Sequence, residues 1–161
     1  MSYSHDYNYE FFFFSFSKVS HFNDDIMYDY VASEMKKNGT VIRNVDYKNI
    51  TELKEEMSKC DAFVGTRFHS VIFAIQSYVP TLALSYDWKA KNFMLDAGFT
   101  DYFIDVDQLS LDQLLDRWES LCSNYEVYNA QIEEINLKYR DLSSRHFDMI
   151  EDLNISCIAW L

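Results

Sequence analysis

The residues best suited to chemistry follow two apolar stretches in the middle of the chain. The segment DAFVGTRFHSVIFAIQSYVPTLALSYDWK, residues 61–89, is typical of a strand, a sharp turn, a helix and a second strand. Its polar side chains follow the expected strand ends and are Arg67, His69, Tyr86, Asp87 and Lys89. Parallel strands end on one edge of their sheet, where doubly wound α/β proteins hold ligands. The pattern therefore predicts a cationic site for a small anion.

Each of these groups has a defined chemical use in such a site. Arg67 can bind a carboxylate or a phosphate through two hydrogen bonds, and Lys89 adds a point charge. His69 beside an anion can stay protonated and act as a general acid. Ser70 opens the expected helix, whose first amide groups favour an anion. The same spacing also fits an Arg and a His that only stabilise the fold, and Asp87 suits a helix N-cap better than a catalytic acid.

The elements that would position this site alternate between strand and helix. Strands are predicted at residues 9–17, 40–45, 62–65, 81–85 and 102–106, with a helix after each of the first four. This order predicts an α/β fold with a mainly parallel, Rossmann-like sheet and flanking helices. The run Phe11–Phe14 is expected to be a strand buried on both faces.

The last third of the chain has a helical period. Leucines recur through residues 111–121, and a narrow apolar stripe then runs from Tyr125 to Leu153. A long C-terminal helix is predicted, which either lies across the domain or pairs with an absent partner. We therefore expect a frayed N-terminus at 1–8, a Rossmann-like domain at 9–123 that carries the predicted anion site, and an amphipathic helix with an apolar tail at 124–161.

Composition excludes several classes of function. The net charge of −12 makes nucleic acid and anionic membrane surfaces poor partners. Cys60, Cys122 and Cys157 are far apart, which argues against a disulfide framework or a zinc site and indicates buried thiols. No signal peptide precedes the short phenylalanine run, so we expect a cytoplasmic protein, or one held at the inner face of the membrane.

Residues 60–99 resemble the polysaccharide pyruvyl transferase family. Members carry Gly-x-Arg-x-His after an apolar strand, then an alanine-bearing helix, a Pro-led strand and Tyr-Asp-x-Lys. The matching positions in this chain are Gly65, Arg67, His69, Ala74, Pro80, Tyr86, Asp87 and Lys89. The resemblance is clearest from residue 50 to 105 and weaker from 9 to 50.

The resemblance implies one half of a GT-B-like fold, the C-terminal half that binds the donor. It implies a transferase that moves the enolpyruvyl carbons of phosphoenolpyruvate onto two hydroxyls of a sugar as a cyclic ketal, with no metal or organic cofactor. By analogy, Arg67 and Lys89 bind the phosphate and carboxylate of the donor. His69 protonates the methylene carbon or stabilises the departing phosphate, and Ser70 and Tyr86 complete the substrate site.

The implied partners are phosphoenolpyruvate and a sugar or lipid-linked oligosaccharide of a bacterial exopolysaccharide. The C-terminal helix is expected to contact a second copy or the N-terminal half that family members carry. Two alternatives remain at this point. One is a GT-B-like glycosyltransferase domain that binds a nucleotide sugar, and the other is a non-catalytic half-domain that acts through a partner.

Overall fold

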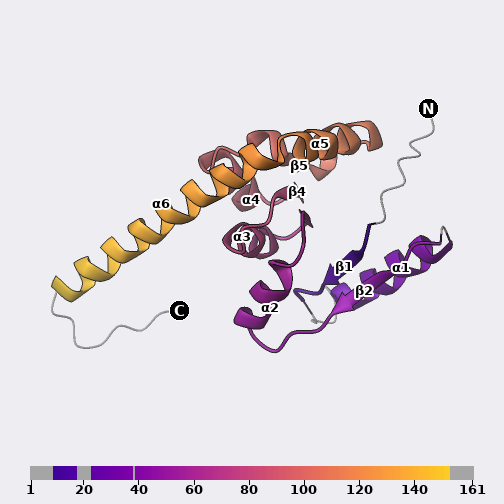
Figure 1. The fold of residues 1–161 in the computed structure, drawn as a ribbon, viewed down its shortest axis with the longest axis horizontal. Helices are drawn as coiled ribbons and strands as arrows, with labels where there is room; N and C mark the ends of the chain where they lie inside the picture. The colour runs from indigo at the N-terminus through magenta and orange to yellow at the C-terminus, as the bar shows by residue number, and fades with distance from the viewer. Residues whose placement is uncertain (1–8, 18–22, 38, 153–161) are drawn as a thin grey trace. The chain divides into compact units, whose positions relative to one another are not determined.

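The chain forms two compact units that both combine parallel strands with helices (Figure 1). The computed structural model describes residues 9–17, 23–37 and 39–152. Its units are Met1–Glu56 and Met57–Leu161. The predicted α/β class with a long C-terminal helix is confirmed. The segment 1–8 and the apolar tail, 155–161, lie outside the described residues.

The first unit contains two parallel strands joined through a helix. Strand β1 (Phe11–Phe14) pairs with β2 (Ile42–Val45), with Phe11 opposite Ile42. Helix α1 (Asp24–Lys37) connects them and packs on β2. Gly39 follows the helix with a φ of 78°, a backbone conformation that glycine adopts without strain.

The phenylalanine run is a strand, but its predicted burial on both faces is wrong. Phe11 and Phe12 are 38% and 40% exposed, whereas Phe14 is buried. Burial of every ring in the run would need a helix layer on each face of the sheet. Helix α1 supplies one such layer to this two-stranded sheet.

Helix α2 (Ile50–Met57) leads from the first unit into the second. Its start is capped by Asn49, whose Oδ1 accepts from the Glu52 backbone N–H at 2.9 Å. Glu52 in turn accepts from the Lys48 backbone N–H at 2.8 Å. Leu53 and Met57 are buried on the apolar side of this helix.

The second unit is built on three parallel strands in the order β3-β4-β5. These strands are Phe63–Gly65, Thr81–Ser85 and Phe103–Asp105. Helices α3 (Phe68–Gln76) and α4 (Trp88–Asp96) make the two crossovers and contact each other. The central strand β4 is buried along nearly its whole length, which explains its continuous apolar sequence.

Short 3₁₀ turns at Thr100–Tyr102 and Val106–Gln108 flank β5, and two helices complete this unit. Helix α5 (Leu111–Ser123) begins at an N-cap, Ser110, whose Oγ accepts from the Gln113 backbone N–H at 3.2 Å. Helix α6 (Tyr125–Asp152) packs against α3 and α5 through its first half. Its residues that join the core are Tyr128, Ile132 and Ile135.

The predicted burial of the cysteines is wrong for Cys122, which is exposed on α5. The preceding residue, Leu121, is fully buried, and adjacent residues on a helix point in different directions. Cys60 is partly buried, and Cys157 lies outside the described residues.

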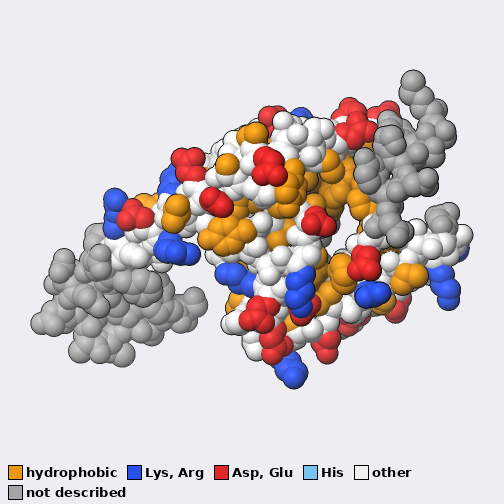
Figure 2. Space-filling model, in the orientation of Figure 1, with side chains coloured by type: hydrophobic (Ala, Val, Ile, Leu, Met, Phe, Trp, Pro, Cys, Tyr) orange, Lys and Arg blue, Asp and Glu red, His pale blue; other side chains and the backbone are white. Residues whose placement is uncertain are grey.

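Acidic and basic side chains are interspersed over the visible surface (Figure 2). Within the part of the chain that is described, no helix has the length and apolar run needed to cross a bilayer.

Candidate functional site

Strands β3 and β4 carry the predicted site residues to one edge of the second sheet. The strands are parallel neighbours, with Gly65 opposite Ala83. Arg67 follows β3 by two residues, and Tyr86 follows β4 directly. Because both strands end on the same side, their following loops open onto the carboxyl edge, the ligand edge of parallel sheets. The side chains come from two junctions between strand and helix on that edge.

The turn between β3 and α3 is held by Ser70. Arg67 is the N-cap residue of α3 and has an extended backbone, with φ −110° and ψ 143°. The Ser70 hydroxyl donates to the Arg67 carbonyl oxygen at 2.7 Å and accepts from the Arg67 backbone N–H at 3.3 Å. Ser70 is buried, with 3% of its surface exposed. Its hydroxyl hydrogen is committed to this turn, so Ser70 serves the site by fixing the backbone of Arg67.

Gly65 lets the strand approach the start of the helix closely. A Cβ atom at this position would lie 2.7 Å from Val71 Cγ2 and 3.2 Å from Ser70 Oγ. Val71 is fully buried, so it has little room to move. The glycine of the Gly-x-Arg-x-His motif is therefore needed for packing between β3 and α3, which sets where the Arg67 turn lies.

The second junction begins α4. The Asp87 carboxylate accepts from the Lys89 backbone N–H at 2.9 Å, which confirms the predicted N-cap. The Asp87 backbone N–H donates to Ser85 Oγ at 3.0 Å. Tyr86 and Trp88 are 79% and 67% exposed, and Lys89 is exposed in the first turn of α4. These side chains are available to a ligand at the sheet edge.

His69 lies in the first turn of α3 and is exposed. Its ring is 5.5 Å from the ring of Phe68 and 6.4 Å from that of Phe73, measured between centroids. Phe68 also packs edge-on against Phe93 of α4 at 6.2 Å. These aromatic contacts pack the first turn of α3 against α4. They therefore hold the β3–α3 junction close to helix α4, which begins at the second junction.

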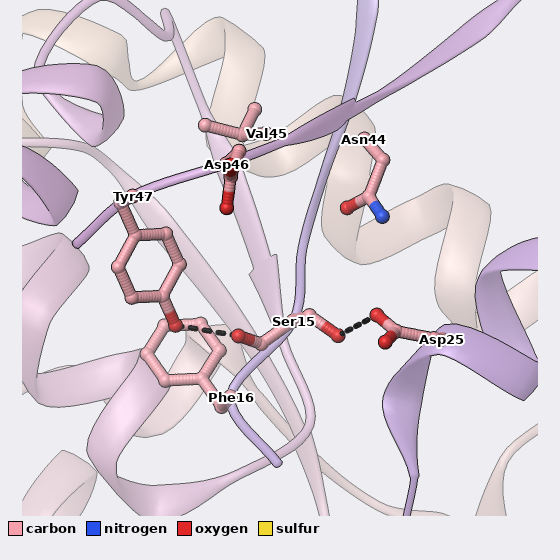
Figure 3. Close-up of a pocket in the computed structure, with 7 residues that line it drawn as sticks. All are labelled: Ser15, Phe16, Asp25, Asn44, Val45, Asp46 and Tyr47. Atoms are coloured by element: carbon pink, nitrogen blue, oxygen red, sulfur yellow. Dashed lines mark hydrogen bonds between the residues drawn. The ribbon is translucent and has the colours of Figure 1, made fainter. Parts of the chain in front are cut away.

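A hollow that the sequence did not predict lies in the first unit (Figure 3). It has a volume of about 600 Å³. Its lining residues are Ser15, Phe16, Asp25, Asn44, Val45, Asp46 and Tyr47. The sequence feature that could have indicated this hollow is the pair of polar residues Asn44 and Asp46, at the end of the second predicted strand. Asp24 and Asp25, in the first turn of α1, accept hydrogen bonds from the segment after β1.

The model of the polysaccharide pyruvyl transferase family matches residues 1–87. This chain belongs to that family. The match includes Arg67, His69 and Tyr86, whereas Lys89 lies two residues beyond its end. The resemblance seen in the central motif is thereby confirmed and extends through the first unit.

A curated relative of this pyruvyl transferase domain is named as an amylovoran biosynthesis protein. The amylovoran biosynthesis protein AmsJ of Erwinia amylovora is 28% identical over 88 residues. The alignment covers 55% of this chain and 21% of AmsJ, so the chain matches about a fifth of that relative. No solved structure matches the chain significantly.

Proposed function

We propose that the second unit is the donor-binding part of a pyruvyl transferase and that its carboxyl edge binds phosphoenolpyruvate. The observation that carries this proposal is the placement of the Arg67 and Lys89 junctions after neighbouring parallel strands. Membership of the pyruvyl transferase family supports the choice of donor. The acceptor would be a sugar of a polysaccharide or of its lipid-linked precursor, met in the cytoplasm or at the inner membrane face.

Phosphoenolpyruvate carries a phosphate and a carboxylate, and this edge supplies cationic groups for both. The planar guanidinium of Arg67 matches either anion with two parallel hydrogen bonds. Lys89 adds a compact positive charge from the start of α4. Helices α3 and α4 both begin at this edge, so their first amide groups add partial positive charge. These groups together favour a ligand with several negative charges.

In the proposed reaction, His69 donates a proton to the methylene carbon of the donor. The carbon that bears the phosphate then forms a bond with the first sugar hydroxyl, whose proton restores the imidazolium. The second hydroxyl attacks the same carbon and the bond to phosphate oxygen breaks. The second hydroxyl proton leaves with the phosphate. The products are the pyruvate ketal of the sugar and inorganic phosphate, and Arg67 and Lys89 stabilise the charge that develops on the phosphate.

Calorimetric titration with phosphoenolpyruvate tests the donor site. Arg67→Ala removes charged hydrogen bonds and is expected to weaken binding by about tenfold or more. Lys89→Ala is expected to weaken it by a smaller factor. The matched controls are Arg140→Ala on α6 and Lys91→Ala on α4, both at exposed positions. They should leave the affinity unchanged.

Two results would contradict the proposal. One is equal phosphoenolpyruvate binding by the wild-type chain and Arg67→Ala. The other is greater thermal stabilisation by a nucleoside diphosphate than by phosphoenolpyruvate, which would favour a glycosyltransferase that binds a nucleotide sugar.

A further inference from the structure

We propose that the hollow in the first unit binds the ring of a neutral sugar. It lies where β1 and β2 end, since Ser15 and Phe16 follow β1 and Asp46 and Tyr47 follow β2. These strands are parallel, with Phe14 opposite Val45. The hollow is therefore at the carboxyl edge, where open parallel sheets bind ligands. Its volume of about 600 Å³ is ample for a sugar ring.

The β2 side of the hollow offers polar groups with no partner among the described residues. Asn44 and Asp46 are two residues apart on an extended segment, so their side chains point to the same side. Figure 3 shows both projecting toward the side on which Ser15 lies. Neither side chain forms a hydrogen bond or an ion pair with another described residue. An amide donor and a carboxylate acceptor beside each other can form hydrogen bonds with two neighbouring sugar hydroxyls, one accepting and one donating.

The opposite side is fixed before any ligand arrives. Ser15 Oγ donates to Asp25 Oδ1 at 2.7 Å, and the Tyr47 hydroxyl donates to the Ser15 carbonyl oxygen (Figure 3). Asp24 accepts from the backbone N–H groups of Phe16 and Ser17 at 2.8 and 3.0 Å. These bonds hold the segment after β1 against the start of α1. A site fixed in this way binds with a smaller loss of conformational entropy.

The described part of the lining disfavours anions. None of the described residues that line the hollow is Lys, Arg or His, and two of them carry carboxylates. Among these described residues, a phosphate or a nucleotide would meet the carboxylates of Asp25 and Asp46 without a compensating cation. Across the described residues, no group of three or more His, Cys, Asp or Glu side chains could hold a metal ion. The described lining therefore disfavours an anion, and its amide, carboxylate and hydroxyl groups suit a neutral ligand rich in hydroxyls.

Aromatic side chains supply the apolar part of the lining. The rings of Phe16 and Tyr47 lie 6.5 Å apart at 52° and form one wall. A pyranose ring has an apolar C–H face as well as hydroxyls, so it suits a wall of rings beside polar groups. The role of this sugar as the acceptor depends on the proposed function. The binding site itself is inferred from the residues that line the hollow.

The ¹H–¹⁵N correlation spectrum of the labelled chain provides the test. The probes are the methyl glycosides of galactose, glucose and mannose, each titrated to about 50 mM because one sugar ring binds weakly. At least one probe should shift the backbone amides of residues 15–16 and 44–47 in a saturable way. Asn44→Ala and Asp46→Ala should each weaken this binding about fivefold. Both positions are exposed, and the same spectra report whether each variant is folded.

Matched controls separate this site from other effects. Asn92→Ala and Asp29→Ala remove the same side-chain types at exposed positions on α4 and α1, and should leave the glycoside shifts unchanged. Arg67→Ala should also retain them, so loss of donor binding alone leaves this proposal standing. The absence of saturable shifts with all three glycosides would overturn it. So would unchanged binding in Asn44→Ala and Asp46→Ala, or a stronger response of these amides to phosphoenolpyruvate or to spermidine.

Discussion

The hydroxyl of Tyr128 in α6 donates a 2.7 Å hydrogen bond to the backbone carbonyl oxygen of Thr81, the first residue of β4. Both residues are fully buried. The Tyr128 ring stacks on Phe99 with centroids 4.5 Å apart and planes at 4°. These contacts join the C-terminal helix to the central strand of the second sheet. The first half of α6 is thus part of the core that supports the proposed donor site.

Replacement of Tyr128 by Phe tests this connection. The variant keeps the ring but leaves the Thr81 carbonyl without its buried donor, so the free energy of unfolding should fall by about 1–2 kcal/mol. Chemical denaturation followed by circular dichroism measures the change. Tyr125→Phe is the control, because the Tyr125 hydroxyl has no hydrogen bond to another described residue. Equal destabilisation by both variants would show that the hydrogen bond from Tyr128 to Thr81 does not contribute to stability.

Alkaline pH should reduce the stability that buried Tyr128 contributes. Burial raises the pKa of Tyr128 well above its ordinary value. Below about pH 10 the residue is neutral in both states, so its full contribution to stability is present. As the pH rises further, the unfolded chain loses this proton first and unfolding becomes more favourable. In denaturation experiments at a series of pH values from about 9 to 11, the free energy of unfolding should therefore fall more steeply for the wild type than for Tyr128→Phe.

Local patterns predicted much of this fold because they depend on few neighbours. The strand Thr81–Ser85 has the predicted bounds, since an apolar run between a proline and polar residues is a local signal. The N-cap role of Asp87 followed from its place before a helix. Burial of the run Phe11–Phe14 could not be predicted, because it depends on which layers cover a two-stranded sheet.

The hollow in the first unit escaped prediction for a similar reason. Its polar lining comes from the segments at the ends of β1 and β2, about thirty residues apart, and from Asp25 at the start of α1. The parallel register of β1 and β2 brings the first two together. The sequence shows Asn44 and Asp46 after a strand, but it does not show that Ser15 faces them. The Arg67 and Tyr86 junctions were easier to predict, because consecutive strands joined by a helix usually lie beside each other.

Gly65→Ala tests the close packing behind the Arg67 turn. The added Cβ meets Val71 Cγ2 at 2.7 Å, so strand or helix must shift. Overpacking of this kind costs about 1–3 kcal/mol, and the thermal midpoint should fall accordingly. The shift should also weaken phosphoenolpyruvate binding, because Ser70 and the Arg67 backbone move with the helix. Gly39→Ala is a useful comparison, since a Cβ there meets nothing within 4 Å and any cost would come from its φ of 78°.

Two substitutions of Asp87 separate its capping role from its charge. Asp87→Ala removes the acceptor for the Lys89 backbone N–H and should lower stability by about 1 kcal/mol. Asp87→Asn retains an oxygen acceptor and should remain within a few tenths of a kcal/mol of the wild type. Thermal denaturation measures both. A loss in the Asn variant as large as that in the Ala variant would show that the carboxylate charge, rather than the cap, stabilises this junction.

The reactivity of Cys122 provides a test of electrostatics on α5. Partial burial raises the pKa of its thiol, and the Glu119 carboxylate one turn earlier raises it further. At pH 8 the reactive thiolate is therefore scarcer than in an unstructured peptide, so a disulfide reagent should react more slowly. In a chain with Cys60 and Cys157 replaced by Ala, Glu119→Gln should increase the rate roughly twofold by lowering the thiol pKa. Glu133→Gln, at an exposed position on α6, should leave the rate unchanged. A rate unaffected by Glu119→Gln would exclude this carboxylate as a cause of the raised pKa.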